Sequence, residues 1–174
     1  MGNVIADWGE VKIYDSIPYK IGHTTHDFRY SFRSSRATFY TLESHPQYIL
    51  KKLNFNKPEF QQGYEILLKA FNRSKKWARI YGLEFDNQFS PFIVYERVEK
   101  TKWKDLQEDQ KFDLIHQLKV ELMKAFDLGW YFYSLTDFNI RIDKGKLILL
   151  GWDNLKPIET NKTFEDYYSW SWLI

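Results

Sequence analysis

The residues able to carry covalent or metal chemistry are few in this 174-residue chain. The chain has no cysteine, which excludes disulfides, thiolate catalysis and zinc sites of the cysteine type. Its histidines are scattered, at His23, His26, His45 and His116. His23 and His26 are close enough to share a loop, but no further ligand follows at the spacing of a metal site. We interpret them as polar loop residues.

Lys51 follows an apolar run over 48–50, a place where a lysine is not explained by solubility alone. Neighbours in a strand of this kind would bury much of its aliphatic stem, so its charged end needs either water or an anionic partner. Glu65 follows 14 residues later, in a segment with helical spacing. The two residues alone leave two interpretations open: a functional ion pair, or two ordinary surface charges.

The first half of the chain has the period-two alternation of strands. Segments rich in β-branched and aromatic residues lie at 19–21, 28–32, 37–42 and 47–53. The turn-like stretch 43–46 separates the last two, which predicts an antiparallel hairpin. Two more strands are predicted at 78–84 and 91–98.

Helical spacing indicates one helix near 58–77, beginning at Asn56 and Pro58, and a longer one near 108–128. The longer helix should carry an amphipathic stripe that ends at Gly129, a natural C-terminal cap. The members of this stripe are Phe112, Ile115, Leu118, Leu122 and Phe126.

A tight hairpin is predicted near the C-terminus, because the apolar segments 139–142 and 146–150 flank the turn residues 143–145. Strands grouped ahead of the helical part indicate an α+β protein. We expect a β-rich part over 1–98 and a smaller part over 99–174.

The bulk composition is that of a folded protein, with 44% hydrophobic and 19% aromatic residues. The net charge of +2 is too mild to indicate nucleic-acid binding by itself. No run approaches the roughly 20 apolar residues of a membrane span, and the start of the chain lacks the basic and apolar regions of a secretory signal. We therefore expect a cytoplasmic protein without membrane association.

The order of these elements, together with particular residues at their junctions, resembles the protein-kinase fold. The strand that ends with Lys51 is similar to the third kinase strand, whose lysine contacts the nucleotide phosphates. Glu65 corresponds to the glutamate that pairs with this lysine. The resemblance implies an N-lobe with an antiparallel sheet and one helix, followed by a minimal helical C-lobe.

The segment 91–106 resembles the hinge strand of kinases and the turn after it. The resemblance places Tyr95 at the gatekeeper position. It also places the backbone from Glu96 to Val98 against an adenine edge.

The chain between the long helix and Asp153 resembles the kinase catalytic loop and metal-binding segment. Asn139 corresponds to the asparagine that binds the second magnesium ion. Phe132 replaces the catalytic-loop histidine, and Ser134 replaces the catalytic aspartate, so no carboxylate is present to accept the substrate proton. Gly151 replaces the aspartate of the Asp-Phe-Gly triplet, so the main metal ligand is missing as well.

Two further departures weaken the resemblance to an active kinase. The segment 22–27, in the place of the glycine-rich loop, keeps only Gly22. Only residues 154–174 follow Asp153, so the region that normally binds peptide substrates is missing, as in small kinase-like bacterial effectors. The aromatic tail 164–174 is better explained as cover for this short lobe than as a surface for a partner.

We therefore expect a catalytically impaired kinase-like domain, a pseudokinase, that acts by binding a partner protein. ATP, with or without magnesium, is the cofactor that the resemblance implies. The residues that would hold it are Lys51, Glu65, Tyr95, Glu96, Val98 and Asn139.

Two alternatives stay open. One is a divergent phosphotransferase in which Asp137 or Asp153 substitutes for the lost carboxylates and, with Asn139, binds metal. The other is nucleic-acid binding through a mixed basic and aromatic surface formed by Arg29, Arg33, Arg36 and the cluster 73–79. The mild net charge favours a solvated positive face over this second alternative.

Overall fold

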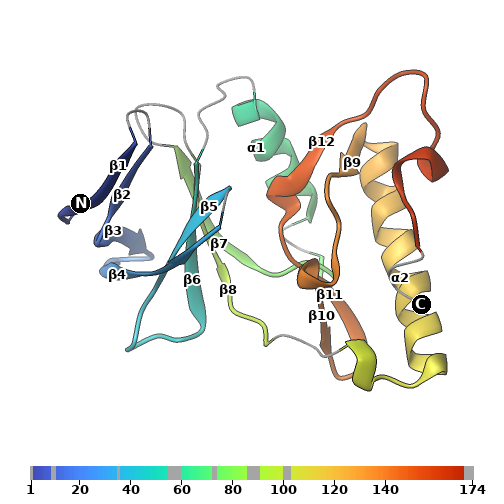
Figure 1. Ribbon diagram of the computed structural model, residues 1–174, viewed down its shortest axis with the longest axis horizontal. Helices are drawn as coiled ribbons and strands as arrows, with labels where there is room; N and C mark the ends of the chain where they lie inside the picture. The colour runs from blue at the N-terminus through green and yellow to red at the C-terminus, as the bar shows by residue number, and fades with distance from the viewer. Residues whose placement is uncertain are drawn as a thin grey trace. The chain divides into compact units, whose positions relative to one another are not determined.

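The computed structural model describes residues 2–8, 11–34, 36–54, 60–71, 74–85, 91–99 and 103–170 (Figure 1). The chain is an α+β protein that divides into two compact units. The N-terminal unit comprises Met1–Arg73 and Arg79–Val98, and the C-terminal unit comprises Ser74–Ala78 and Glu99–Ile174. No helix in the described ranges is long and apolar enough to cross a membrane.

A six-stranded antiparallel sheet forms most of the N-terminal unit, in the order β3-β4-β5-β6-β8-β7. Its strands are β3 (Ser16–Ile21), β4 (Thr24–Arg33), β5 (Ala37–Thr41), β6 (Tyr48–Leu53), β7 (Ile80–Phe85) and β8 (Pro91–Glu96). The predicted hairpin of β5 and β6 is present. A separate ribbon of β1 (Val4–Trp8) and β2 (Val11–Tyr14) was not predicted.

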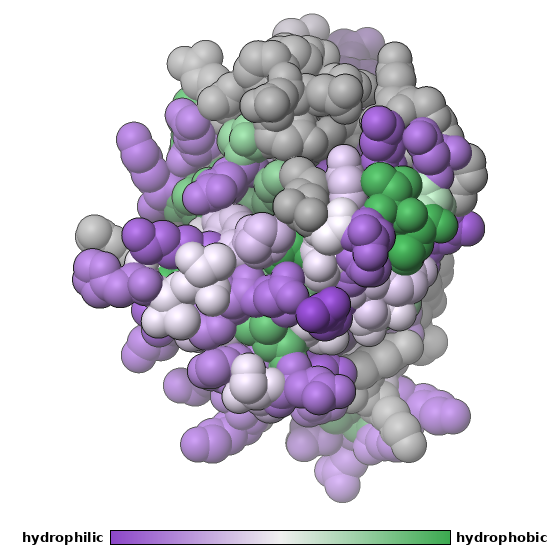
Figure 2. Space-filling view, turned by 90° about the vertical axis from the view of Figure 1, so that its left-hand side faces the viewer, coloured by the Kyte–Doolittle hydropathy of each residue, from purple (hydrophilic) through white to green (hydrophobic). Residues whose placement is uncertain are grey.

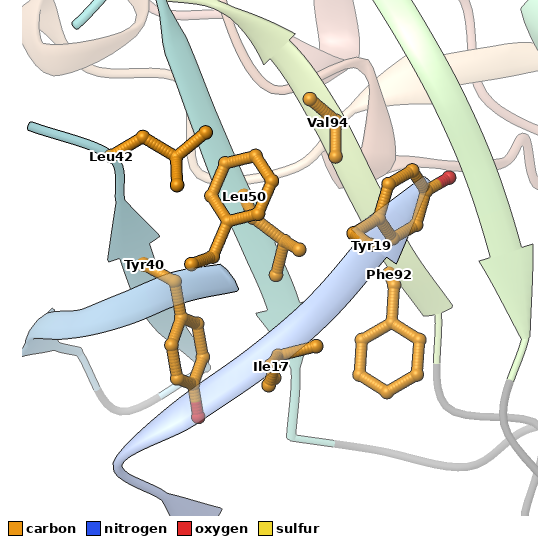
Figure 3. Packing of buried hydrophobic residues seen from close by; sticks show 8 residues of the cluster. Ile17, Tyr19, Tyr40, Leu42, Leu50, Phe92 and Val94 are labelled. Atoms are coloured by element: carbon orange, nitrogen blue, oxygen red, sulfur yellow. The ribbon is translucent and has the colours of Figure 1, made fainter. Parts of the chain in front are cut away.

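The inner face of this sheet carries the hydrophobic core of the unit (Figure 3). The core residues are Ile17, Tyr19, Phe28, Tyr40, Leu42, Leu50, Phe92 and Val94. Tyr19 of β3 lies against Gly82 of β7, because a Cβ atom added at Gly82 would overlap the Tyr19 side chain. Since β3 and β7 are the two ends of the strand order, this contact shows that the sheet is curled until its edges approach.

Substituting Gly82 by alanine is expected to displace Tyr19 and to lower the free energy of unfolding by about 1–3 kcal/mol, the usual cost of overpacking. Urea denaturation of the Gly82→Ala variant measures this change in the free energy of unfolding. The nearest atom to the added Cβ is the Tyr19 hydroxyl oxygen, so the same substitution in a Tyr19→Phe background should cost less. Equal costs in the two backgrounds would show that the Tyr19 contact is not the cause.

Burial of tyrosine side chains makes stability depend on pH in alkaline solution. Burial raises the pKa of Tyr40 to about 12, and burial likewise raises the pKa of Tyr168 to about 12. The folded state holds both phenols neutral, so their stabilising contribution is complete below the ordinary pKa of about 10 and is lost as the pH rises toward 12. Urea denaturation at several pH values should show a free energy of unfolding that falls between pH 10 and 12. A Tyr40→Phe variant should show a shallower fall, and an equally steep one would contradict the assignment.

Helix α1 (Phe60–Phe71) is shorter than the helix predicted near 58–77. The predicted start at Asn56 and Pro58 lies outside the described residues, as do the side chains of 60–64. The predicted end was wrong. Trp77 does not continue the helix, because its backbone N–H donates to the Ser74 carbonyl in a turn (3.4 Å) and its ring is buried in the C-terminal unit.

The long helix α2 (Glu108–Asp127) occupies the predicted range. It begins with a capping box, in which the Gln107 backbone N–H donates to the Gln110 side chain (3.1 Å). It ends where Gly129 adopts a φ of 92°, as the glycine there predicted. The predicted stripe was wrong at its first residue, since Phe112 is 78% exposed. The buried residues are Leu114, Leu118, Glu121, Leu122 and Ala125.

Short strands complete the C-terminal unit beside α2. Strand β9 (Trp130–Phe132) pairs with β12 (Leu155–Pro157), and β10 (Ile140–Asp143) pairs with β11 (Lys146–Leu149). The β10–β11 hairpin turns at Lys144 and Gly145, whose φ values of 51° and 77° suit a type I′ turn. This hairpin lies where the sequence predicted it.

The aromatic tail packs onto the C-terminal unit. Phe164 and Tyr168 are buried, and Phe126 of α2 contacts Phe164 with ring centroids 5.7 Å apart. The Tyr168 hydroxyl accepts a hydrogen bond from the Phe132 backbone N–H (2.9 Å). Phe164 and Tyr168 are therefore part of the core, while 171–174 lie outside the described residues.

Candidate functional site

The loop after β9 carries the residues that the sequence places in a catalytic loop. Ser134 is exposed and has a φ of 54°, an uncommon left-handed conformation for a non-glycine residue. The 3-10 helix η2 (Asp137–Asn139) follows, with Thr136 at its N-cap. The sharp turn at Ser134 presents its side chain to solvent rather than to a buried partner.

Asn139 ties this loop to the end of β11. The side chain is 5% exposed, and its Oδ1 accepts a hydrogen bond from the Thr136 backbone N–H (3.1 Å). Its Nδ2 donates to the Leu150 carbonyl (3.4 Å), and the Leu150 backbone N–H donates to the Asn139 carbonyl (2.8 Å). To bind a cation, the Asn139 oxygen would have to give up its contact with Thr136.

Gly151 lies directly against Asn139. It has a φ of 84°, and a Cβ atom added there would lie 3.1 Å from Asn139 Nδ2 and 3.0 Å from Asn154 Nδ2. The structure thus brings together the two positions to which the resemblance assigns metal binding. The space that a carboxylate would need at Gly151 is filled by two amide groups.

The two aspartates proposed as substitutes lie in different environments. Asp153, in the 3-10 helix η3 (Trp152–Asn154), is 5% exposed. Asp137 is exposed at the first position of η2. The two carboxylates therefore differ in their access to solvent. Across the described ranges, no three His, Asp or Glu side chains are placed to hold a metal ion.

In the N-terminal unit, Lys51 lies in the middle of one sheet face. It pairs with Phe39 of β5 and with Ile93 of β8, and its Nζ is 5.8 Å from the centroid of the Phe39 ring. Tyr95 follows Ile93 by two residues in β8, so it shares this face. The structure brings together Lys51 and the predicted gatekeeper position.

Phe32 lies beside Lys51's neighbour Phe39, with the two ring centroids 4.5 Å apart and stacked at an interplanar angle of 14°.

The segment with Gly22 lies further away, in the two-residue turn between β3 and β4. There Gly22 has a φ of 62°. Since β5 lies between β4 and β6, which carries Lys51, residues 22–27 are not adjacent to Lys51 in the sheet.

Glu65 is exposed on α1. Of the ion pairs between described residues, none joins Glu65 to Lys51. Their predicted pairing stays a prediction, and both residues belong to the same unit.

The predicted hinge backbone is partly occupied by hydrogen bonds within the N-terminal unit. The Glu96 backbone N–H donates to the Arg79 carbonyl (2.8 Å), and the Arg97 backbone N–H donates to the Gln47 carbonyl (2.8 Å). The Glu96 carboxylate also accepts from the Arg79 backbone N–H (2.9 Å). Val98 is half-buried. An adenine edge would therefore have to use backbone groups other than these two amides.

The basic residues suggested for nucleic-acid binding do not act as one set of charges. Arg29 forms an ion pair with Asp27 (2.9 Å), and Arg79 lies over the Tyr81 ring, 4.9 Å from its centroid. Arg73 lies outside the described residues. This alternative gains no support from the geometry.

Exposed aromatic side chains beside Ser134 were missed in the sequence. Tyr133 is 42% exposed and Phe138 is 49% exposed. Pairing of β9 with β12 brings the Lys156 Nζ to 3.6 Å from the Tyr133 ring centroid. The sequence feature that could have indicated them is the presence of Tyr133 and Phe138 on either side of 134–137. That loop is polar except for Leu135.

Among the described residues, the face shown in Figure 2 is largely hydrophilic with small apolar patches. No protein-family model matches the chain, and no curated protein matches its sequence.

Proposed function

We propose that this chain is a kinase-like domain without phosphotransferase activity that acts as a protein-binding module through the surface around Ser134. The observation that carries the proposal is the arrangement of Ser134, Asn139 and Gly151. Ser134 has a hydroxyl where kinases have a carboxylate. The Asn139 amide forms hydrogen bonds within its own loop and to Leu150. Gly151 has no side chain.

The order of segments in the C-terminal unit supports a kinase-like domain. Ser134 precedes Asn139 by five residues, which is the spacing of the aspartate and asparagine in the kinase catalytic-loop motif. The hairpin β10–β11 and Gly151 follow, and the strands on either side, β9 and β12, pair with each other. This pairing closes the segment, and the β10–β11 hairpin within it brings Asn139 against Gly151.

The chemistry of these residues supports the absence of catalysis. Phosphoryl transfer depends on positioning and on magnesium ions that neutralise developing charge. A serine hydroxyl is a poor general base at neutral pH, because the pKa values at which it gains or loses a proton are far from neutrality. In the described part of the chain, no group of three His, Asp or Glu side chains is placed to hold magnesium.

Exposed aromatic side chains near Ser134 support a role in binding. Tyr and Phe are enriched at protein interfaces relative to the rest of the surface. Tyr133 and Phe138 present two partly exposed rings of this kind in the C-terminal unit.

The proposal is tested by incubating the purified protein with labelled ATP, magnesium or manganese, and a range of protein and small-molecule acceptors. We expect no more labelled product than with the Lys51→Ala variant. Transfer that requires Lys51 would overturn the proposal. Loss of that transfer in Asp137→Ala or Asp153→Ala would then assign it to the divergent phosphotransferase.

The binding role is tested by comparing proteins retained by the wild type and by variants. A Tyr133→Ala/Phe138→Ala double variant should lose the specific partner. Phe112→Ala, which removes a ring that is 78% exposed on α2, is the matched control and should retain it. Retention by the double variant would place the binding surface elsewhere.

A further inference from the structure

Two histidines from different hairpins meet at one end of the N-terminal unit's sheet. His26 lies on β4, and His45 lies in the connection between β5 and β6. Their ring centroids are 4.8 Å apart, with the ring planes at 65°. The sheet therefore places His26 beside His45, which is 19 residues away in sequence.

Surrounding rings hold this pair in place. Tyr48 of β6 contacts both imidazoles, with its centroid 6.1 Å from that of His26 and 6.0 Å from that of His45. Phe28 contacts the His26 ring edge-to-face at 6.5 Å. Both histidines are half-buried. Since these contacts come from β4 and β6 of the same sheet, the sheet holds the two imidazoles near each other.

One nitrogen of His45 is already engaged. Its Nδ1 lies 2.9 Å from Ser44 Oγ. In the tautomer in which Nδ1–H donates to Ser44, the free lone pair is on Nε2. A hydrogen bond on the remote nitrogen is the usual way in which proteins orient a metal-binding histidine.

The spacing of the two rings suits a shared metal ion. A metal bound about 2.0–2.1 Å from an imidazole nitrogen lies roughly 3.2 Å from the ring centroid. Two such rings at metal-centred angles of about 90–110° have centroids ~4.5–5.3 Å apart. The observed separation of 4.8 Å falls inside this range.

We propose that His26 and His45 form a binding site for a divalent transition metal ion of the class that imidazole prefers, such as zinc, nickel or copper. No cluster of three or more His, Asp or Glu ligands occurs in the described part of the chain. Water therefore completes the coordination, which leaves the ion exchangeable. Bound metal links β4 to the β5–β6 connection and stabilises the folded N-terminal unit by mass action.

The test is isothermal titration calorimetry of tag-free protein with Zn²⁺ and with Ni²⁺ in a buffer that does not chelate them. We expect one ion per chain, and binding that is abolished in His26→Gln and in His45→Gln. Ser44→Ala should weaken binding by about tenfold, because it removes the orienting hydrogen bond but no ligand. His23→Gln, which alters an exposed histidine in the adjacent turn, is the matched control and should bind like the wild type.

Circular dichroism of each variant verifies the fold, and NMR of the wild type provides an independent readout. Substoichiometric Ni²⁺ should broaden the imidazole signals of His26 and His45 before those of His116. Three results would each overturn the proposal: no binding of either ion up to about 1 mM, binding that survives the double His26→Gln/His45→Gln substitution, or equal loss in His23→Gln.

Discussion

Replacing Trp77 by alanine is expected to lower the free energy of unfolding by about 3–5 kcal/mol, the range for large aromatic residues removed from a core. The Trp77 ring is 2% exposed and lies against Phe132, with centroids 6.3 Å apart. Its Nε1 donates a hydrogen bond to Glu121 Oε2 (3.2 Å), and that carboxylate is itself 2% exposed. The substitution therefore leaves both a cavity and a buried carboxylate with one donor fewer.

Urea denaturation of the purified variant measures this effect. A Trp77→Phe variant is the control, since it removes the indole N–H but leaves one six-membered ring in the site and so a smaller cavity than alanine does. We expect it to cost about 1–3 kcal/mol, because Glu121 stays buried with an unmet acceptor. A cost below about 1 kcal/mol for Trp77→Ala would show that residues 74–78 do not pack in the C-terminal unit as described.

Replacing Gly151 by alanine should destabilise the protein by about 2–4 kcal/mol. A left-handed residue with a Cβ atom costs about 1–2 kcal/mol, and the new atom must also displace the amides of Asn139 and Asn154. Gly145→Ala is a matched control, because Gly145 has a similar φ of 77° but no atom within 4 Å of an added Cβ. It should incur the backbone cost alone.

The comparison of these two glycine variants by thermal and urea denaturation tests the close contact between Gly151 and Asn139. Equal costs would show that the added atom meets open space at both positions. If Gly151→Ala is the more costly, an aspartate at this position is disfavoured as well. A Ser134→Asp/Gly151→Asp double variant is then expected to lose stability and to gain no phosphotransferase activity.

Local patterns in the sequence predicted much of the secondary structure. The β10–β11 hairpin was predictable because Lys144 and Gly145 can adopt the positive φ values of its turn. The end of α2 was predictable because Gly129 can leave the helix in a left-handed conformation. The short strands β9 and β12 were not, because their three-residue pairing depends on segments far apart in the chain.

Tertiary contacts explain where the sequence analysis failed. The predicted stripe of α2 was wrong at Phe112 and did not include Glu121, because hydrophobic periodicity does not assign a charged residue to a buried position. The burial of Glu121 is possible only because Trp77 and Lys124 donate hydrogen bonds to it (3.2 and 2.9 Å). Trp77 was placed in the wrong element for the same reason, since its partner is 44 residues away.

Of the two candidate sites, one could be predicted from local sequence and the other depends on tertiary contacts. The closeness of Asn139 to Gly151 follows from a tight hairpin between them, so it was within reach of the sequence. The histidine pair was not. Loop proximity grouped His26 with His23, whereas the cross-strand pairing of β4 with β5 brings His26 to His45.

The contact between Tyr19 and Gly82 has a consequence for how the protein behaves in concentrated solution. An open sheet offers the unpaired amides of its two outermost strands as a template on which other chains can polymerise. Because β3 and β7 approach each other through this contact, a neighbouring chain has less room to add a strand at either border. A variant that loosens Tyr19 would therefore show faster hydrogen exchange in both strands at once, and fibril formation at lower protein concentration than the wild type.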